Sequence, residues 1–367
     1  MTHEKRVEEA RRRYQAACNF EESDRVPVMI DTGGPFFCSL AGYTFKDYYR
    51  NLDVQRKAQL EGLNWVHENL GDDRLNYGTY TWLDMGALAE GIVFDCEMQL
   101  PDEEHPWLSP WIIPKLRTPE DLERLEVPDP KEVEKRLQRH LQRQFGKPVK
   151  ADIPGIHPPL SAAGSLMGTD RLYIYVYKYP ALLHKLLRKL LETYILLVDY
   201  QAEQRGKETE SIGLCDDHAG FLPERMYREF VLPYNKAIYE RYGKNWRGLH
   251  MDSQCDHIAQ ILVNELKINS MDVSVSTDIA NVKPIFDGKV IIHGNFDGKL
   301  LAPGVSYKKI KDAVDYCMRS AAPGGGYIFD TGGEGIYPGI DVNRLLFMVK
   351  YAKKAGKYPI REEAHPS

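Results

Sequence analysis

Histidine and carboxylate side chains, which act as acids, bases and metal ligands, follow several short apolar runs between Arg247 and Pro338. The polar residues at the ends of these runs are His250, Thr277, Asp278, His293 and Asp330. Buried parallel strands show this pattern, because both of their faces are apolar and polar groups collect where the strand stops. The repetition predicts that these side chains line one rim of an α/β barrel.

A second polar cluster, Asp216-Asp217-His218, follows the strand-like run Ser211-Ile-Gly-Leu-Cys215. Neighbouring carboxylates raise each other's pKa, so Asp216, Asp217 and His218 are candidates for supplying a proton or orienting a substrate. The alternative is that one aspartate only caps the segment that follows.

Three residues are candidates for lining a substrate pocket. Asp31 ends an apolar run just before Gly33-Gly34, and His157 lies in a proline-rich loop. Tyr77 belongs to an aromatic group with Tyr80 and Trp82, which would form a wall for a substrate ring or, as such groups more often do, part of the core.

Strand-like and helix-like segments alternate along the chain and must position these residues. We expect a charged N-terminal helix within residues 1–20, a strand over 150–157, and further helices at 41–71, 179–205, 223–242, 257–266, 305–321 and 341–355. This order favours an α/β fold, a (β/α)8 TIM-type barrel with an N-terminal helical extension. An open doubly wound sheet is the alternative, but the chain has no Gly-x-Gly-x-x-Gly turn. Residues 100–150, rich in proline and charge, are interpreted as a peripheral insertion in a single domain over 1–367.

Composition excludes several classes of protein. The net charge of −5 and the lack of a basic stripe argue against nucleic-acid binding. No apolar stretch approaches the roughly 18 residues of a membrane span, and the charged N-terminus has no signal core. The six cysteines are scattered without a Cys-x-x-Cys pair, which is typical of reduced thiols. We therefore expect a cytoplasmic protein with no nucleic-acid or membrane partner.

Several ordered motifs resemble those of the uroporphyrinogen decarboxylase-like superfamily, which also contains corrinoid-dependent methyltransferases. They are Asp24-Arg-Val-Pro-Val, Cys215-Asp-Asp-His with Pro223-Glu-Arg-Met-Tyr-Arg-Glu-Phe-Val-Leu-Pro233, His250-x-Asp252, Val290-Ile-Ile-His-Gly-Asn295-Phe-Asp297, Gly326-Tyr-Ile-Phe and Gly333-Glu-Gly-Ile. The resemblance extends from about residue 5 to 358. It implies a TIM-type barrel with its site at the carboxyl ends of the strands. It also implies a site-lining role for Asn295, with a structural loop hydrogen bond as an equal alternative.

One branch of the superfamily fits poorly. Porphyrin decarboxylases have a Met-Arg-Gln-Ala-Gly-Arg motif after the first strand, whose arginines neutralise substrate carboxylates. The corresponding stretch here is Val28-Met-Ile-Asp31-Thr-Gly-Gly-Pro, which has an acid and no arginine. An aspartate has the wrong charge for a polycarboxylate substrate, so porphyrinogen decarboxylation is disfavoured.

The methyltransferase branch implies a metal site. Its zinc ligands are a His-x-Cys pair and a later cysteine in a Gly-Cys-Gly loop, which correspond here to His250, Asp252 and Glu334. One imidazole and two carboxylates suit a divalent metal, most simply zinc, and favour polarisation of an ether or hydroxyl oxygen over activation of a thiol. The alternatives are a hydrogen-bonded His250, an Asp252 that caps a helix near Gln254, and a solvated Glu334.

The resemblance therefore implies demethylation of a small methylated compound, of the methyl ether or methylamine class. The methyl group would pass to the cobalt of a corrinoid on a separate protein, because the chain lacks an Asp-x-His-x-x-Gly cobalamin motif. A metal-free decarboxylase or lyase and a non-catalytic ligand-binding relative are the alternatives. Barrels of this superfamily often pair, so a homodimer is the expected assembly.

Overall fold

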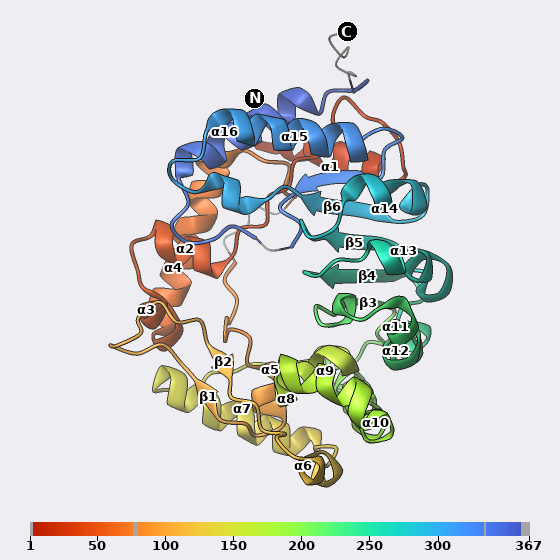
Figure 1. Ribbon diagram of the computed structural model, residues 1–367. Helices are drawn as coiled ribbons and strands as arrows, with labels where there is room; N and C mark the ends of the chain where they lie inside the picture. Colours follow the sequence, from red (N-terminus) through yellow and green to blue (C-terminus); the bar gives the residue numbers. More distant parts are fainter. Residues whose placement is uncertain (1–2, 76–79, 334, 361–367) are drawn as a thin grey trace. The chain divides into compact units, whose positions relative to one another are not determined.

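The computed structural model describes residues 3–75, 80–333 and 335–360, and Figure 1 labels its helices and strands. The backbone divides into two units. Unit 1 comprises Met1–Gly42, Lys57–Thr81 and His250–Ser367, and unit 2 comprises Tyr43–Arg56 and Trp82–Leu249. The prediction of a single domain over 1–367 stays a prediction.

Strands and helices alternate from Ser211 onward, as the sequence predicts. The strands form one sheet in the order β3-β4-β5-β6-β7, with the bounds β3 (Ser211–Cys215), β4 (Trp246–Met251), β5 (Ser270–Val273), β6 (Ile291–Asn295) and β7 (Tyr327–Asp330). β5 pairs with β6 and β6 with β7 in parallel. The register places Asp272 opposite His293 and Asn295 opposite Asp330. Polar residues of neighbouring strands therefore meet in unit 1.

The N-terminal apolar segment adds to this sheet beside β7. The amide of Met29 donates to the carbonyl oxygen of Phe329 at 3.0 Å, and the amide of Phe329 donates to the carbonyl oxygen of Pro27 at 2.9 Å. Val28 and Phe329 form a parallel bridge, and both side chains are fully buried. The predicted strand that ends at Asp31 is therefore a short parallel addition whose end lies near the end of β7.

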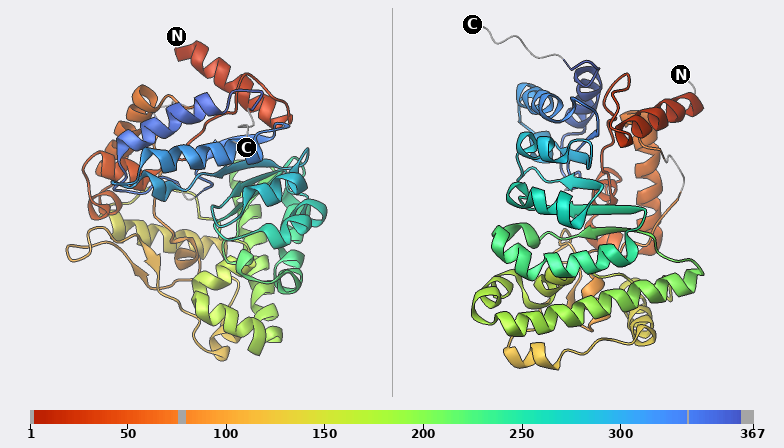
Figure 2. Two further views of the ribbon diagram at one scale, coloured as in Figure 1. Left: turned by 45° about the horizontal axis from the view of Figure 1, so that its top comes forward. Right: turned by 90° about the vertical axis from the view of Figure 1, so that its right-hand side faces the viewer.

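Helices of unit 1 follow most of these strands. They are α1 (His3–Cys18), α2 (Gly34–Leu40), η1 (Val66–Leu70), η3 (Asp256–Ile258), α13 (Ala259–Ile261), η4 (Leu262–Leu266), α14 (Ile279–Phe286), η5 (Gly298–Leu301), α15 (Tyr307–Ala321) and α16 (Val342–Ala355). α4 (Leu52–Trp65) passes from unit 2 into unit 1. The blue helices α15 and α16 lie side by side in both views of Figure 2, and α15 also packs on β6 and β7.

Unit 2 is mainly helical. Its elements are α3 (Phe45–Arg50), α5 (Ala89–Val93), β1 (Met98–Gln99), β2 (Trp111–Ile112), α6 (Pro119–Arg124), α7 (Pro130–Phe145), α8 (Pro159–Met167), α9 (Thr169–Lys178), α10 (Pro180–Arg205), β3, η2 (Ala219–Phe221), α11 (Glu224–Phe230) and α12 (Leu232–Tyr242). Within the predicted insertion, β1 and β2 pair antiparallel, and Thr118 begins α6 with a capping box. Leu137 and Leu141 of α7 are buried against Leu88 and Ile92, so this segment has its own apolar core.

One predicted strand is absent, and another ends earlier than its polar stop suggests. β5 ends at Val273, four residues before Thr277, and Asp278 accepts a hydrogen bond from the amide of Ala280 at 3.0 Å and begins α14. Residues 150–157, all of them described, lie in coil, although a strand is predicted there. Prolines at 154, 158 and 159 have no backbone N–H group, so this stretch lacks hydrogen-bond donors that pairing with a neighbouring strand requires.

Among the described helices, none is both long enough and apolar enough for a membrane span.

Candidate functional site

His250 at the end of β4 lies between two carboxylates of unit 1. Its Nε2 is 3.4 Å from Oδ1 of Asp252, and its Nδ1 is 3.6 Å from Oδ2 of Asp272. His293 of β6 lies on the other side of Asp272, with 4.0 Å between its Nδ1 and Asp272 Oδ1. The parallel register of β5 and β6 places Asp272 and His293 opposite each other and so fixes this grouping.

Asp31 and Asp330 lie at the ends of the neighbouring strands. The backbone amide of Asp31 donates to Asp330 Oδ1 at 2.9 Å, and the amide of Thr331 donates to the same oxygen at 2.7 Å. Desolvation and the charge of Asp31 hold the pKa of Asp330 well above its usual value, despite these hydrogen bonds. Asp31 is exposed to solvent on one side, but neighbouring protein atoms surround most of its carboxylate. Desolvation and the charge of Asp272 raise its pKa, although Arg74 and His250 act in the opposite direction. Asp31 and Asp330 therefore lie in a region of negative charge.

The spacing of His250 and Asp252 fits two ligands of one divalent metal. With metal–ligand bonds near 2.0–2.1 Å, two ligand atoms of a tetrahedral site are roughly 3.3 Å apart. The 3.4 Å between His250 Nε2 and Asp252 Oδ1 agrees with this. Asp272 lies near Nδ1, the other ring nitrogen of His250. A carboxylate in this position commonly orients a histidine that binds a metal through its remaining nitrogen. Capping does not explain Asp252, because the N-cap residue of η3 is Cys255.

The third predicted ligand, Glu334, lies outside the described residues. Its neighbour Gly333 lies against the His250 ring: a Cβ atom on Gly333 would be 2.4 Å from His250 Cε1 and 2.5 Å from Nδ1. Gly333 also has φ of +86°, a conformation that favours glycine. The loop after β7 therefore passes directly over the imidazole.

Asn295 at the end of β6 is held by protein contacts. Its Nδ2 donates to the carbonyl oxygens of Ser274 at 3.1 Å and Thr277 at 2.9 Å. The Cys317 thiol donates to its Oδ1 at 3.8 Å. These contacts agree with the structural hydrogen-bond alternative for Asn295.

Asp216 in unit 2 is fully buried, with 0% of its surface exposed. Its Oδ1 accepts from the Ser161 hydroxyl and its Oδ2 from the Asn235 amide, each at 2.6 Å. Desolvation raises its pKa, although these hydrogen bonds act in the opposite direction. Asp216 thus joins β3 to α8 and α12, and its contacts fit a positioning role.

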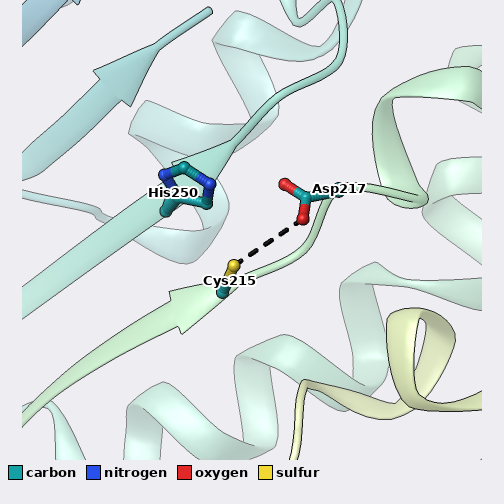
Figure 3. A group of neighbouring side chains, drawn as sticks. All are labelled: Cys215, Asp217 and His250. Atoms are coloured by element: carbon teal, nitrogen blue, oxygen red, sulfur yellow. Dashed lines mark hydrogen bonds between the residues drawn. The ribbon is translucent and has the colours of Figure 1, made fainter. Parts of the chain in front are cut away.

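Asp217 and His218 have different surroundings. Figure 3 shows Asp217 beside Cys215 at the end of β3, where the thiol donates to Asp217 Oδ2 at 3.7 Å, and it also labels His250 on β4. The His218 ring is packed so closely on α8 that a Cβ atom on Gly164 would be 2.5 Å from its Nε2. Desolvation lowers the pKa of His218 and favours its neutral form.

His157 is paired with Glu90, a residue that sequence reasoning missed. Glu90 lies on α5 with 1% of its surface exposed. Its Oε1 is 2.8 Å from His157 Nδ1 and accepts the backbone amide of His157 at 2.7 Å. Burial opposes both charges, but their partners outweigh it: His157 lowers the pKa of Glu90, and Cys215 together with Glu90 raises the pKa of His157. His157 is therefore an ion-paired imidazole.

The remaining predicted pocket residue, Tyr77, lies outside the described residues. Its aromatic neighbour Tyr80 is exposed. Asp272, like Glu90, was missed from the sequence. In both cases the available signal was an acid inside an apolar run, Ser-Met-Asp272-Val and Ala-Glu90-Gly-Ile-Val.

Comparison with known proteins identifies the family. The model of the family described as Uroporphyrinogen decarboxylase (URO-D) matches residues 9–355. The chain belongs to this family, and the resemblance noted in its motifs is confirmed. Its parallel sheet and alternating helices confirm the α/β fold class, that of the TIM-barrel families.

Individual relatives are distant. The chain is 25% identical over 265 residues to a uroporphyrinogen decarboxylase of Photorhabdus laumondii, a match that covers 65% of this chain and 69% of that protein. A uroporphyrinogen decarboxylase of Hamiltonella defensa is 30% identical over 238 residues, covering 59% and 63%. A solved methyltransferase from Methanosarcina mazei has a TM-score of 0.64 at 19% identity, covering 94% of this chain and 98% of that one. At this identity the structural likeness shows the fold alone.

Proposed function

We propose that this protein demethylates a small methyl ether or methylated amine and passes the methyl group to the cobalt of a corrinoid on a separate protein. The observation that carries this proposal is the spacing of His250 and Asp252, which suits a divalent metal, within a group of carboxylates. The fold shared with a methyltransferase from Methanosarcina mazei is compatible with it.

The charge of the site separates this proposal from porphyrinogen decarboxylation. Asp31, Asp252, Asp272 and Asp330 are the acids of the unit 1 site. Arg74 lowers the pKa of Asp31, but its guanidinium already bonds Asp72, the Ile30 carbonyl oxygen and Thr32. A polycarboxylate substrate would need cations at these places. A neutral or cationic methyl donor fits better.

His250, Asp252 and the predicted ligand Glu334 would hold the metal, with zinc as the expected ion. When bound, a divalent ion supplies Lewis-acid polarisation of the leaving oxygen or nitrogen. Asp272 would keep the His250 ring oriented through Nδ1. Asp31, with its raised pKa, would orient the substrate and hold a proton near it. Asp217 and His218 remain predicted proton donors.

The transfer balances in bonds and electrons. The carbon–oxygen or carbon–nitrogen bond of the donor breaks, and its electron pair stays with oxygen or nitrogen. A new carbon–cobalt bond forms from the electron pair of the Co(I) acceptor. An alkoxide leaving group takes up one proton, which is why an acid or a metal is needed for an ether.

Metal analysis tests the site. We expect about one zinc per wild-type chain after reconstitution and a loss of about tenfold or more in affinity for H250A and E334A. His105, which is exposed and outside the site, gives the matched control H105A with unchanged metal content. Metal content unchanged in both H250A and E334A would overturn the site.

Spectroscopy tests the reaction. The protein would be mixed with a Co(I) corrinoid carrier and a panel of methyl ethers and methylated amines, and the cobalt absorbance followed. We expect conversion with at least one donor, and none with H250A. The absence of conversion with every donor, together with release of carbon dioxide from uroporphyrinogen, would establish the alternative. The decarboxylase alternative is supported by the similarity of the chain to uroporphyrinogen decarboxylases of Photorhabdus laumondii and Hamiltonella defensa.

A further inference from the structure

The helix α9 of unit 2 has a solvent-facing side with large apolar residues. α9 packs on α8 and α10 (Figure 1). Its buried residues are Leu172, Tyr175 and Val176. Ile174 and Tyr177, on the opposite side, are 49% and 63% exposed. The packing of α9 therefore leaves these two side chains facing solvent.

Phe221 of η2 extends this apolar surface within unit 2. It is 67% exposed, the largest fraction among the exposed large apolar side chains of the described residues. Its ring contacts that of Tyr173 on α9 edge to face, with 6.1 Å between the ring centroids. The Tyr173 hydroxyl donates to the carbonyl oxygen of His218 at 2.8 Å, which holds the ring in place. A group of exposed apolar and aromatic side chains is typical of a protein interface.

The charges on α9 stand at equal distances on either side of Ile174. Asp170 precedes Ile174 by four residues and Lys178 follows it by four, so the three share one side of the helix. Asp170 and Lys178 are both exposed, and each is about 6 Å along the helix axis from Ile174. When a second α9 lies antiparallel to the first, with a twofold axis at Ile174, each Asp170 faces Lys178 of the other copy. This side of α9 is therefore complementary to itself in charge, as a twofold contact requires.

We infer that α9 is the surface through which two copies of this chain associate, with their α9 helices antiparallel about a twofold axis at Ile174. A second copy fits better than an acidic or a basic protein, because a partner with one sign of charge would be repelled by either Asp170 or Lys178. The contact involves residues of unit 2 only and does not depend on the proposed methyl transfer.

The size of the apolar surface sets the strength of this association. A fully buried aromatic side chain covers roughly 150–250 Å², so the exposed parts of Ile174, Tyr177 and Phe221 offer on the order of 300–400 Å² per chain. A standard interface buries about 800 Å² per partner. We therefore expect a reversible dimer with a dissociation constant on the order of 10 µM.

Sedimentation velocity of the full chain between about 1 and 100 µM tests the association. The dimer fraction of the wild type should rise over this range. I174D places two carboxylates against each other at the twofold axis and should be monomeric throughout. The matched control is L196D, because Leu196 is also exposed on a helix of unit 2 but lies about 24 Å from the start of α10, and this variant should dimerise like the wild type. A wild type that is monomeric at the highest concentration, or an I174D dimer as strong as the wild type, would overturn the inference.

Two charge variants test the antiparallel arrangement. D170K and K178D, each alone, place like charges opposite each other at both ends of the contact and should dimerise about tenfold more weakly than the wild type. An equal mixture of the two variants brings opposite charges together at both ends and should dimerise like the wild type. This recovery would also show that both variants are folded. Single variants as strong as the wild type, or a mixture that does not recover, would overturn the antiparallel pairing.

Discussion

Buried histidines of this chain differ in the partner that each one has. His157 faces the carboxylate of Glu90, which favours its charged form. His140 is bonded to the amide oxygen of Gln144 at 2.7 Å, and His218 to a hydroxyl. Desolvation lowers the pKa of both His140 and His218. These two residues should therefore be neutral at pH 7.

Acidification below about pH 6.5 should destabilise the protein through these neutral histidines. Their pKa values are lowered in the folded state, so the unfolded state binds more protons in this window. Their contribution is complete above about pH 6.5 and is lost as the pH falls toward the folded-state pKa. H140Q removes one such group and should reduce the slope of the unfolding free energy by up to about 1.4 kcal/mol per pH unit.

Urea unfolding at several pH values between about 5.5 and 7.5 measures this slope. The control is H105Q, since His105 is exposed. Equal slopes for wild type and H140Q would contradict the prediction.

The loop between β7 and α16 is the element on which the proposed metal site depends. Gly332, Gly333, Gly335 and Gly339 all have positive φ. Gly333 alone of these places a would-be Cβ against His250, whereas a Cβ at Gly339 would meet no atom within 4 Å. Substitutions at Gly333 and Gly339 therefore distinguish the effect of backbone strain from the effect of contact with the His250 imidazole.

G333A should displace either the loop or the His250 ring and lower metal affinity by about tenfold or more. G339A has a similar φ, +83° against +86°, and should cost only the backbone strain of about 1 kcal/mol in stability. Metal content by elemental analysis and unfolding free energy should both be measured. A similar loss of metal in both variants would show that contact with His250 is not the cause.

At the scale of the molecule, Asp73 joins segments of unit 1 that are far apart in sequence. Its side chain is almost fully buried and accepts from Arg13 of α1, from Arg25 and from the amide of Val28. These contacts fix α1 and the N-terminal segment that pairs with β7. The N-terminal helix is therefore part of the packed unit and contributes to the position of Asp31.

D73A should destabilise the protein by about 3–5 kcal/mol, because it leaves two buried arginines without their shared partner. The matched control is D24A: Asp24 also pairs with Arg13, but its side chain is 44% exposed. This partly exposed pair should be worth about 1 kcal/mol or less. Chemical denaturation measures both, and equal losses would mean that burial does not set the value of these pairs.

The chain order of helices and strands could be predicted from the sequence because local signals specify it. Ser306 and Asp341 cap the starts of α15 and α16, within the ranges 305–321 and 341–355 where the sequence predicts helices. The family could be recognised for the same reason, since its motifs are continuous stretches such as Cys215-Asp-Asp-His. The strand predicted over 150–157 is absent from the structure. The apolar pattern of that segment does not show whether a neighbouring strand is available to pair with it.

The sequence by itself determined that polar residues follow the strands and that His250 is a candidate ligand. Tertiary structure decided which groups meet: Asp272 reaches His250 through the register of β5 and β6, and Glu90 of α5 pairs with His157. It also decided that Asp216 is enclosed by Ser161 and Asn235. Burial and partners between distant segments arise only when the chain packs, and they set the charge and the role of each acid and histidine.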